Sequence, residues 1–351
     1  MPDFVRSRPH PGWLLLFVVF FLTLPAALRA ETRIGGTVSG ETRWDKSGSP
    51  YIVSEDILVP KGSTLTIGPG VTLRFKENIA DQSGTNWFDL ELIVEGTLKI
   101  EGAEADTVYL TSDATRPTWQ DWQGIVVRGG DARADIRGAH IEYSVEGIRC
   151  TDGEVVLHDS SIQFCDQAGV HCINGRGVLD GLSETRIGNF GGTAIGVWLD
   201  TGSRVDIRNS FIVGVQNGLS YSRGSSGYLG YTVITLSTSN GLMIRNSDPE
   251  VTHTTVSGNE YGVVLTAGAT PSLKANNFFK NGVADVWLRE YRDKIVKIDL
   301  SGNFWGTEDL AEIEEQVLDG VDNPNEKAYA ILEPFLQSAV STDSSVDEGK
   351  P

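Results

Sequence analysis

Apolar and polar residues alternate in a unit of roughly 22 residues that recurs along the middle of the chain. Each copy begins with Gly and an aliphatic residue, and the next inward apolar position follows two residues later. The copies begin at Gly124-Ile125, Gly147-Ile148, Gly169-Val170, Gly196-Val197, Gly218-Leu219, Gly241-Leu242 and Gly262-Val263. One step is 27 residues long where the others are 21–23, so it holds a small insertion. This alternation predicts short strands with one buried face.

A second ladder places two apolar residues five positions apart in the rest of each repeat. Its pairs are Ile136/Ile141, Leu157/Ile162, Leu182/Ile187, Ile207/Ile212, Leu229/Ile234, Val251/Val256 and Leu273/Phe278. Such repeats are too short for helix pairs, and the Leu-x-x-Leu-x-Leu signature of leucine-rich repeats is missing. The pattern predicts an all-β fold, a single-stranded right-handed parallel β-helix of roughly ten coils stacked about 4.8 Å apart.

The N-terminal part of the chain predicts a leader and two less regular coils. Residues 1–30 combine basic residues, an apolar run and small residues in the order of a secretory signal peptide, with cleavage expected after Ala30 or a few residues earlier. The segments 57–75 and 92–112 alternate strongly and are predicted coils, and the polar segment 77–86 between them is predicted to be a loop. We therefore expect an exported protein, periplasmic or extracellular, without a membrane span.

The C-terminal part predicts a cap for the open end of the stack, where strand edges need covering. Thr307 is a plausible N-cap for a helix over residues 308–319, and Leu310, Ile313 and Val317 form its apolar stripe. Residues 341–351 have the composition of a disordered tail. One β-helix domain, caps included, is therefore expected over residues 31–340.

The charge of the chain argues against a nucleic-acid partner. The sequence holds 29 basic and 47 acidic side chains, a net charge of −18, and removing residues 1–30 takes away three Arg and one Asp and leaves −20. An acidic surface also disfavours long polyanionic ligands unless basic side chains cluster locally. We expect a soluble monomer.

Three stretches resemble bacterial right-handed parallel β-helix repeat proteins, a group that includes carbohydrate-binding proteins and sugar hydrolases and is akin to pectate lyases. They are Trp44–Phe75, the turn Trp122-Gln-Gly-Ile125, and the ending from Gly302-Asn-Phe-Trp-Gly-Thr307 to Pro334-Phe-Leu336. The resemblance covers nearly the whole chain after residue 30 and implies the β-helix fold. It also implies a polysaccharide or cell-envelope glycan as the ligand class, although fold alone does not fix activity.

The chemistry of a polygalacturonate hydrolase is not visible in the sequence. The resemblance implies Asn-Thr-Asp, Asp-Asp, Gly-His-Gly and Arg-Ile-Lys for such enzymes, and none of the four strings occurs. No outward carboxylate cluster suggests the paired acids of a glycosidase. The leading hypothesis is a non-catalytic exported scaffold or binding protein, with a polysaccharide lyase or glycoside hydrolase of unrecognised type as the alternative. A purely structural surface role is a third possibility.

The outward positions of the Gly-initiated strands supply the candidate ligand site. Two residues after each Gly stand Arg149, His171, Trp198, Ser220, Met243 and Val264, with Trp287 next in register. Arg149, His171, Trp198 and, two positions further along its strand, Asp200 could line a saccharide groove, because indole faces stack on sugar rings and charged groups fix hydroxyls. The alternative is an ordinary solvated strand face.

The remaining candidate residues favour packing over chemistry. Trp119 and Trp122 are expected to pack against a neighbouring coil, with ligand contact as the alternative. Cys150 and Cys172 share one inward slot on successive coils; buried thiols are favoured over a disulfide because stacked side chains lie about 4.8 Å apart. Cys165 is expected near a bend. His140, His158 and His253 look isolated, no metal or cofactor motif occurs, and none is expected.

Overall fold

The computed structural model describes residues 31–77, 84, 86–185 and 195–346. The predicted signal peptide and most of the predicted loop at 77–86 lie outside the described residues, as do residues 347–351 of the predicted tail. Residues 341–346 of that tail are described and include the 3-10 helix η2 (Ser344–Val346). No helix among the described residues is long and apolar enough to cross a membrane.

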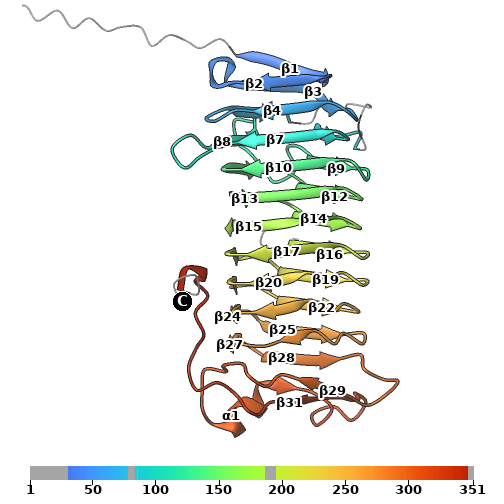
Figure 1. The fold of residues 1–351 in the computed structure, drawn as a ribbon, viewed down its shortest axis with the longest axis vertical. Helices are drawn as coiled ribbons and strands as arrows, with labels where there is room; N and C mark the ends of the chain where they lie inside the picture. The colour runs from blue at the N-terminus through green and yellow to red at the C-terminus, as the bar shows by residue number, and fades with distance from the viewer. Residues whose placement is uncertain (1–30, 78–83, 85, 186–194, 347–351) are drawn as a thin grey trace, which may run out of the picture. The chain divides into compact units, whose positions relative to one another are not determined.

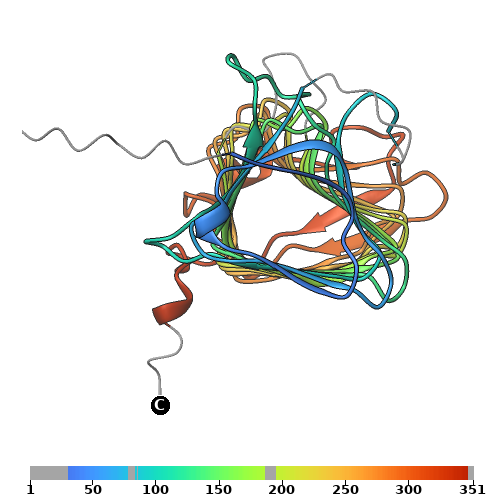
Figure 2. The ribbon, with the colours of Figure 1, turned by 90° about the horizontal axis from the view of Figure 1, so that it is seen from above.

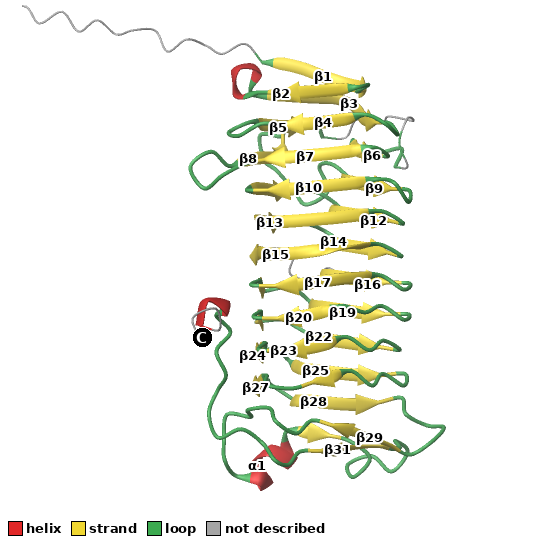
Figure 3. Ribbon diagram, viewed as in Figure 1, coloured by secondary structure: helices red, strands yellow, loops and turns green. Residues whose placement is uncertain are grey.

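The described chain from residue 31 onward is a parallel β-helix, as predicted. Twenty-nine of its strands form one parallel sheet, which winds into stacked coils (Figures 1 and 3), and Figure 2 shows successive coils superposed when the stack is viewed along its axis. Each full coil contributes one strand to each of three faces. Face 1 consists of β1 (Thr32–Thr37), β3 (Tyr51–Val59), β6 (Glu91–Val94), β9 (Gly124–Arg128), β12 (Glu146–Thr151), β14 (Ala168–Ile173), β16 (Ile195–Asp200), β19 (Asn217–Ser222), β22 (Asn240–Arg245), β25 (Tyr261–Thr266), β28 (Ala284–Arg289) and β30 (Val317–Leu318).

The other two faces follow along each coil, and two long strands bend from face 2 into face 3. Face 2 consists of β2 (Glu41–Trp44), β4 (Thr64–Ile67), β7 (Thr97–Glu101), β10 (Arg133–Arg137), the first halves of β13 (Glu154–Gln163) and β15 (Arg176–Thr185), β17 (Arg204–Arg208), β20 (Tyr228–Gly230), β23 (Glu250–Thr252) and β26 (Ser272–Leu273). Face 3 consists of the start of β3, β5 (Thr72–Phe75), β8 (Val108–Ser112), β11 (Ala139–Glu142), the second halves of β13 and β15, β18 (Phe211–Val213), β21 (Val233–Thr235), β24 (Thr255–Ser257) and β27 (Asn277–Phe279).

The recurring Gly at the start of face 1 is explained by the close approach of neighbouring coils. A Cβ on Gly218 would come within 2.4 Å of the carbonyl oxygen of Gly241, and a Cβ on Gly262 within 2.4 Å of the oxygen of Asp285. No side chain fits at such a distance, so only Gly lets the coils stack at this bend. The aliphatic residues that follow are fully buried and stack in register, for example Val197 on Leu219.

One step of the second ladder was assigned wrongly. Leu179, and not Leu182, lies in register between Leu157 and Ile207. The insertion of the long repeat falls after β15, in residues outside the described part of the chain, whereas the predicted pairing placed it earlier. Leu182 is also buried, so both leucines fit an inward position and the pattern could not tell them apart. Its predicted partner, Ile187, lies outside the described residues.

A cap closes the C-terminal end of the stack, as predicted, but its helix is shorter than expected. Helix α1 covers Leu310–Glu315, and Asp309 is its N-cap and accepts a hydrogen bond from the amide of Ala311. Val317 leaves the predicted helix because it forms β30 and pairs with Val286 at the end of face 1. A separate parallel pair, β29 (Val296–Asp299) and β31 (Ala328–Ile331), completes the cap.

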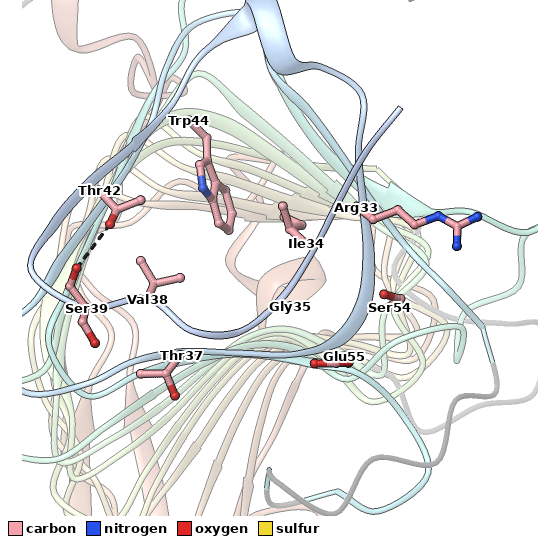
Figure 4. A pocket seen from close by; sticks show the side chains of 10 residues that line it. All are labelled: Arg33, Ile34, Gly35, Thr37, Val38, Ser39, Thr42, Trp44, Ser54 and Glu55. Atoms are coloured by element: carbon pink, nitrogen blue, oxygen red, sulfur yellow. Dashed lines mark hydrogen bonds between the residues drawn. The ribbon is translucent and has the colours of Figure 1, made fainter. Parts of the chain in front are cut away.

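The N-terminal end presents a cavity of about 540 Å³ at the first coil, next to the 3-10 helix η1 (Lys46–Gly48). Ile34, Val38 and Trp44 line it and pack against the apolar interior while remaining partly exposed (Figure 4). Arg33 and Glu55 stand at its edge. Among the described residues no strand pairs with β1 on its outer side, so this end carries a different surface from the capped end.

Buried side chains connect consecutive coils at the bend from face 3 back to face 1. Asn259 accepts the amide of Ser237, Asn281 accepts the amide of Asn259, and Asp285 accepts the amide of Asn281, with donor–acceptor distances of 2.9–3.1 Å. Asp285 also accepts the side-chain amide of Asn281 at 2.8 Å. The ladder satisfies backbone N–H groups that the bend removes from the sheet.

Replacing Asp285 by Asn is expected to stabilise the protein at neutral pH. Burial raises the pKa of Asp285 and outweighs the hydrogen bonds from Asn281, which lower it. A carboxyl with a raised pKa in the folded state contributes stability below its unfolded value of about 3.8, and loses it as the pH rises through the folded value. Asp285→Asn keeps the accepting oxygen without the buried charge. Chemical unfolding at pH 7 and near pH 4 should show an advantage for the variant only at pH 7; an equal difference at both pH values would contradict this account.

Candidate functional site

The strand register places the predicted candidate residues of face 1 in one row. Arg149 pairs with His171, His171 with Trp198, and Trp198 with Ser220. The same row continues through Met243 and Val264 to Trp287. Side chains of one row stand one above another at the spacing of neighbouring strands. The partly exposed members alternate with buried ones: Arg149, Trp198, Met243 and Trp287 are partly exposed, and His171, Ser220 and Val264 are buried.

His171 is fixed on both sides and is almost completely buried. Its ring stacks on Trp198 with a centroid separation of 4.1 Å and an interplanar angle of 1°. Its Nδ1 lies 2.7 Å from Oε1 of Glu146, and only 6% of its side chain is exposed. Its Nε2 is buried without a hydrogen-bond partner among the described residues. His171 therefore positions the indole of Trp198, and the protein covers it from solvent.

Glu146 links the histidine to the arginine of the row. Its Oε2 lies 3.2 Å from Nη1 of Arg149, and its own side chain is 2% exposed, whereas 40% of Arg149 is exposed. The carboxylate thus holds His171 through one oxygen and Arg149 through the other. Sequence reasoning missed Glu146, although its position directly before Gly147, at the start of the strand that carries Arg149, was an available signal.

Asp200 joins the other three predicted residues through Ser222. Its Oδ1 accepts the hydroxyl of Ser222 at 2.9 Å, and its Oδ2 pairs with Arg223 at 3.1 Å. The indole Nε1 of Trp198 donates to the same hydroxyl at 3.4 Å. Only 7% of the Asp200 side chain is exposed, so this carboxylate orients Trp198 and Arg223 and is itself covered.

A second aromatic and cationic set lies further along the same face. Trp287 stacks on Tyr261 with ring centroids 5.0 Å apart, and the guanidinium carbon of Arg289 lies 4.5 Å from the centre of the Trp287 ring. Arg245 pairs with Glu290 at 2.8 Å beside this set. The outward row thus carries an indole with an arginine nearby at two places, four register steps apart.

The other candidate residues divide between packing and polar contacts. Trp122 is fully buried and stacks on Phe75 at 3.9 Å, which confirms the packing prediction, while Trp119 is partly exposed. Cys150 and Cys172 are in register and, like Cys165, are buried free thiols. The described residues hold no group of three or more His, Cys, Asp or Glu side chains that could bind a metal ion.

The prediction that three histidines are isolated is wrong. Nδ1 of His140 lies 2.5 Å from the Ser161 hydroxyl, and its Nε2 lies 3.0 Å from Glu142. His158 lies 3.8 Å from Asp180, and His253 stacks on Tyr231. The sequence did not show these contacts, because most of them join residues of neighbouring coils, and the contact between His140 and Glu142 requires both side chains to lie on the same side of one strand.

Comparison with known proteins identifies the fold. Residues 146–303 match the family model described as the right handed beta helix region. The crystal structure of the periplasmic alginate epimerase AlgG superposes with a TM-score of 0.54 at 15% identity, over 86% of this chain and 85% of that chain. A mutant of that enzyme gives a TM-score of 0.50 at 12% identity, over 87% and 77% of the two chains. No curated protein matches the sequence significantly. At these identities the likeness shows the fold alone.

Proposed function

Since this chain is a right-handed parallel β-helix protein, we propose that it is an exported scaffold that binds a polysaccharide or cell-envelope glycan along face 1 without cleaving the glycan backbone. A linear polymer that lies along the stack can contact a partly exposed side chain of the outward row at every second coil, about 9.6 Å apart. The structural relative is an alginate epimerase, and this supports a polysaccharide as the ligand class. The apolar leader at residues 1–30 supports export.

The observation that carries the proposal is the pair of aromatic and cationic sets on face 1. Trp198 and Arg149, two register steps apart with His171 between them, form one set, and Trp287 with Arg289 over its ring forms the other. Four register steps separate the two indoles, which corresponds to about 19 Å. An extended oligosaccharide can contact both sets at once, and two linked contacts bind far more tightly than either alone.

The charges of these sets favour a neutral or weakly charged glycan. Arg149 is paired with Glu146, and Arg289 lies 3.6 Å from Glu290. Each cation is therefore largely compensated, and the chain outside residues 1–30 carries a net charge of −20. Such a face attracts long polyanions poorly, whereas its indoles and hydrogen-bonding groups suit sugar rings and hydroxyls.

The alternative, a polysaccharide lyase or glycosidase, is favoured by one observation. Glu146 and His171 form a hydrogen-bonded carboxylate–imidazole pair whose Nε2 has no partner among the described residues, as an acid–base pair requires. The binding function is preferred because the same imidazole is covered and its ring is stacked on Trp198. Assays for new reducing ends and for unsaturated uronates test the alternative, and cleavage of any glycan backbone would refute the binding proposal.

Removing the indole of Trp198 is expected to weaken glycan binding about 5-fold, since an aromatic contact of this kind contributes on the order of 1 kcal/mol. Arg149→Ala should have an effect of similar size, and combining Trp198→Ala with Trp287→Ala should weaken binding more than either single change. A glycan array finds the ligand, and isothermal titration calorimetry measures the affinities.

The control for this experiment is Tyr228→Ala on face 2. Arg208 lies over the Tyr228 ring, 5.0 Å from its centre, so the pair has the same chemistry on a different side of the stack. This variant should keep wild-type affinity. Equal losses in the face 1 and face 2 variants, or no loss in Trp198→Ala, would remove face 1 as the binding surface.

A further inference from the structure

Three polar side chains of face 3 form a serine–histidine–glutamate relay. His140 and Glu142 lie two residues apart on β11 and therefore point to the same outward side, and Ser161 on β13 pairs in register with His140. The Ser161 hydroxyl lies 2.5 Å from Nδ1 of His140, and Nε2 of His140 lies 3.0 Å from Oε2 of Glu142. A nucleophile, a base and an orienting carboxylate are thus connected in the order that acyl transfer requires.

The hydrogen bonds of Glu142 determine the direction in which a proton can pass along the relay, from Ser161 to His140. Thr111 donates to its Oε1 at 2.6 Å. Burial raises the pKa of Glu142, but the bonds from His140 and Thr111 outweigh it and hold the pKa below its usual value, so the carboxylate is ionised and can only accept. The proton of His140 then resides on Nε2, and Nδ1 is left to accept the hydroxyl proton of Ser161.

The relay opens into a cavity of about 680 Å³ between faces 2 and 3. His140, Ser161 and Ser183 line it together with Tyr109, whose ring lies 5.5 Å from the His140 ring. Ser183 is the register partner of Ser161 on the next coil, about 4.8 Å away, and its exposed hydroxyl can donate to an oxygen held beside Ser161. Small residues form half of the rest of the wall, namely Gly102, Ala103, Gly138, Ala139 and Gly181, and the charged side chains of Glu104, Arg137 and Asp159 also line it. The small residues leave room for a short acyl group.

We propose that Ser161, His140 and Glu142 form a hydrolytic site for short-chain O-acyl esters. The site lies on face 3, uses none of the candidate residues of face 1, and does not depend on glycan binding there. The hydroxyl of Ser161 attacks the acyl carbonyl, and its proton passes to Nδ1 of His140. The bond to the leaving alkoxide breaks as that oxygen takes the proton from His140. Water then attacks the acyl-serine with His140 as base, which releases the carboxylic acid and restores Ser161.

A fluorophosphonate probe tests the nucleophile directly on the full-length protein. We expect labelling of Ser161, identified by mass spectrometry of the modified peptide, and its absence in Ser161→Ala. His140→Ala should slow the labelling about 100-fold or more, which is the usual contribution of a general base. Hydrolysis of p-nitrophenyl acetate should fall in the same two variants.

Ser257→Ala serves as the matched control, because Ser257 is also an outward serine of face 3 but pairs with Thr235 and Phe279 instead of a histidine. It should label and hydrolyse like the wild type. Circular dichroism and thermal unfolding verify that each variant is folded. As a second measurement, Ser161→Cys should react with iodoacetamide faster than the same variant combined with His140→Ala, since the three native thiols are buried. No label on the folded protein, a label at another serine, or thiol reactivity that does not depend on His140 would each overturn the site.

Discussion

Replacing Trp122 by alanine is expected to lower the free energy of unfolding by about 3–5 kcal/mol, the usual cost of removing a buried aromatic side chain. The Trp122 side chain is completely buried and stacks on Phe75 with an interplanar angle of 10°. Its indole nitrogen also donates to the carbonyl oxygen of Glu142 at 2.8 Å. The variant loses the apolar burial, the ring stack and this hydrogen bond together, and leaves a large void at the bend between coils. Urea unfolding followed by intrinsic fluorescence and circular dichroism measures the loss.

Trp87→Ala is the control for this prediction. Trp87 belongs to the same residue type, but 63% of it is exposed. Truncating an exposed side chain away from special features changes stability by about 0.5 kcal/mol or less. If the two variants were equally stable, the interior position of Trp122 would be wrong. A loss in Trp122→Ala below about 1 kcal/mol would contradict the close packing described for this bend.

Replacing Asn303 by aspartate is expected to lower the free energy of unfolding by about 3 kcal/mol or more. Asn303 is fully buried, and its Oδ1 accepts from both the backbone amide and the side-chain amide of Asn276. Its Nδ2 donates to the carbonyl oxygens of Leu273 and Leu300, both at 2.9 Å. Aspartate keeps the accepting oxygen but places a charged oxygen against two carbonyl oxygens in a site without water access. Aspartate therefore has nearly the same shape as asparagine but destabilises the fold, because it presents an acceptor where this site needs a donor.

The matched control is Asn325→Asp, because Asn325 is exposed in the C-terminal cap. Its stability should remain close to that of the wild type. The deficit of Asn303→Asp should also shrink as the pH falls, since protonation restores a donor to the buried carboxyl. Equilibrium unfolding at neutral and acidic pH measures both effects. A deficit that is independent of pH would show that the loss comes from packing and not from charge.

The fold could be predicted because a β-helix repeats the same local rule at each coil. Once Gly147 and Gly169 define one step, the residues two positions later, Arg149 and His171, must lie in register, and they do. The rule fails where the repeat length changes. The 27-residue step could be divided in more than one way, so Leu182 was placed where Leu179 belongs.

The ends of the stack were harder to predict than its middle. Leu310, Ile313 and Val317 satisfy helical periodicity, yet Val317 joins the last strand of face 1. The exposed edge of β28 offers backbone hydrogen bonds to Val317, and these outweigh the local preference for helix. Periodicity contains no information about such an edge, so the predicted helix extended too far.

The candidate sites could not be predicted from the strand register alone, because they also depend on where each side chain reaches. The pair Ile141 and Ile162 already placed His140 opposite Ser161, but the role of Glu142 follows only when its side chain is seen to reach the far nitrogen of the ring. Likewise, the row that contains Arg149 and His171 was predictable, whereas the bridge through Glu146 was not. The direction in which a side chain reaches, and how deeply it is covered, depend on packing that a one-dimensional pattern does not specify.

The nearly constant number of residues per coil in the middle of the stack has a consequence for how the protein folds. In the middle of the stack, residues that touch across neighbouring coils are separated by about the same short stretch of sequence, as with Leu219 and Leu242 or Leu242 and Val263, whereas Ile57 and Leu92 near the N-terminal end are further apart in the sequence. The entropy lost in closing each loop is therefore nearly the same throughout the middle of the stack, and it does not grow with the length of the chain. Folding can therefore begin in any favourable coil and propagate to the neighbouring coils in both directions.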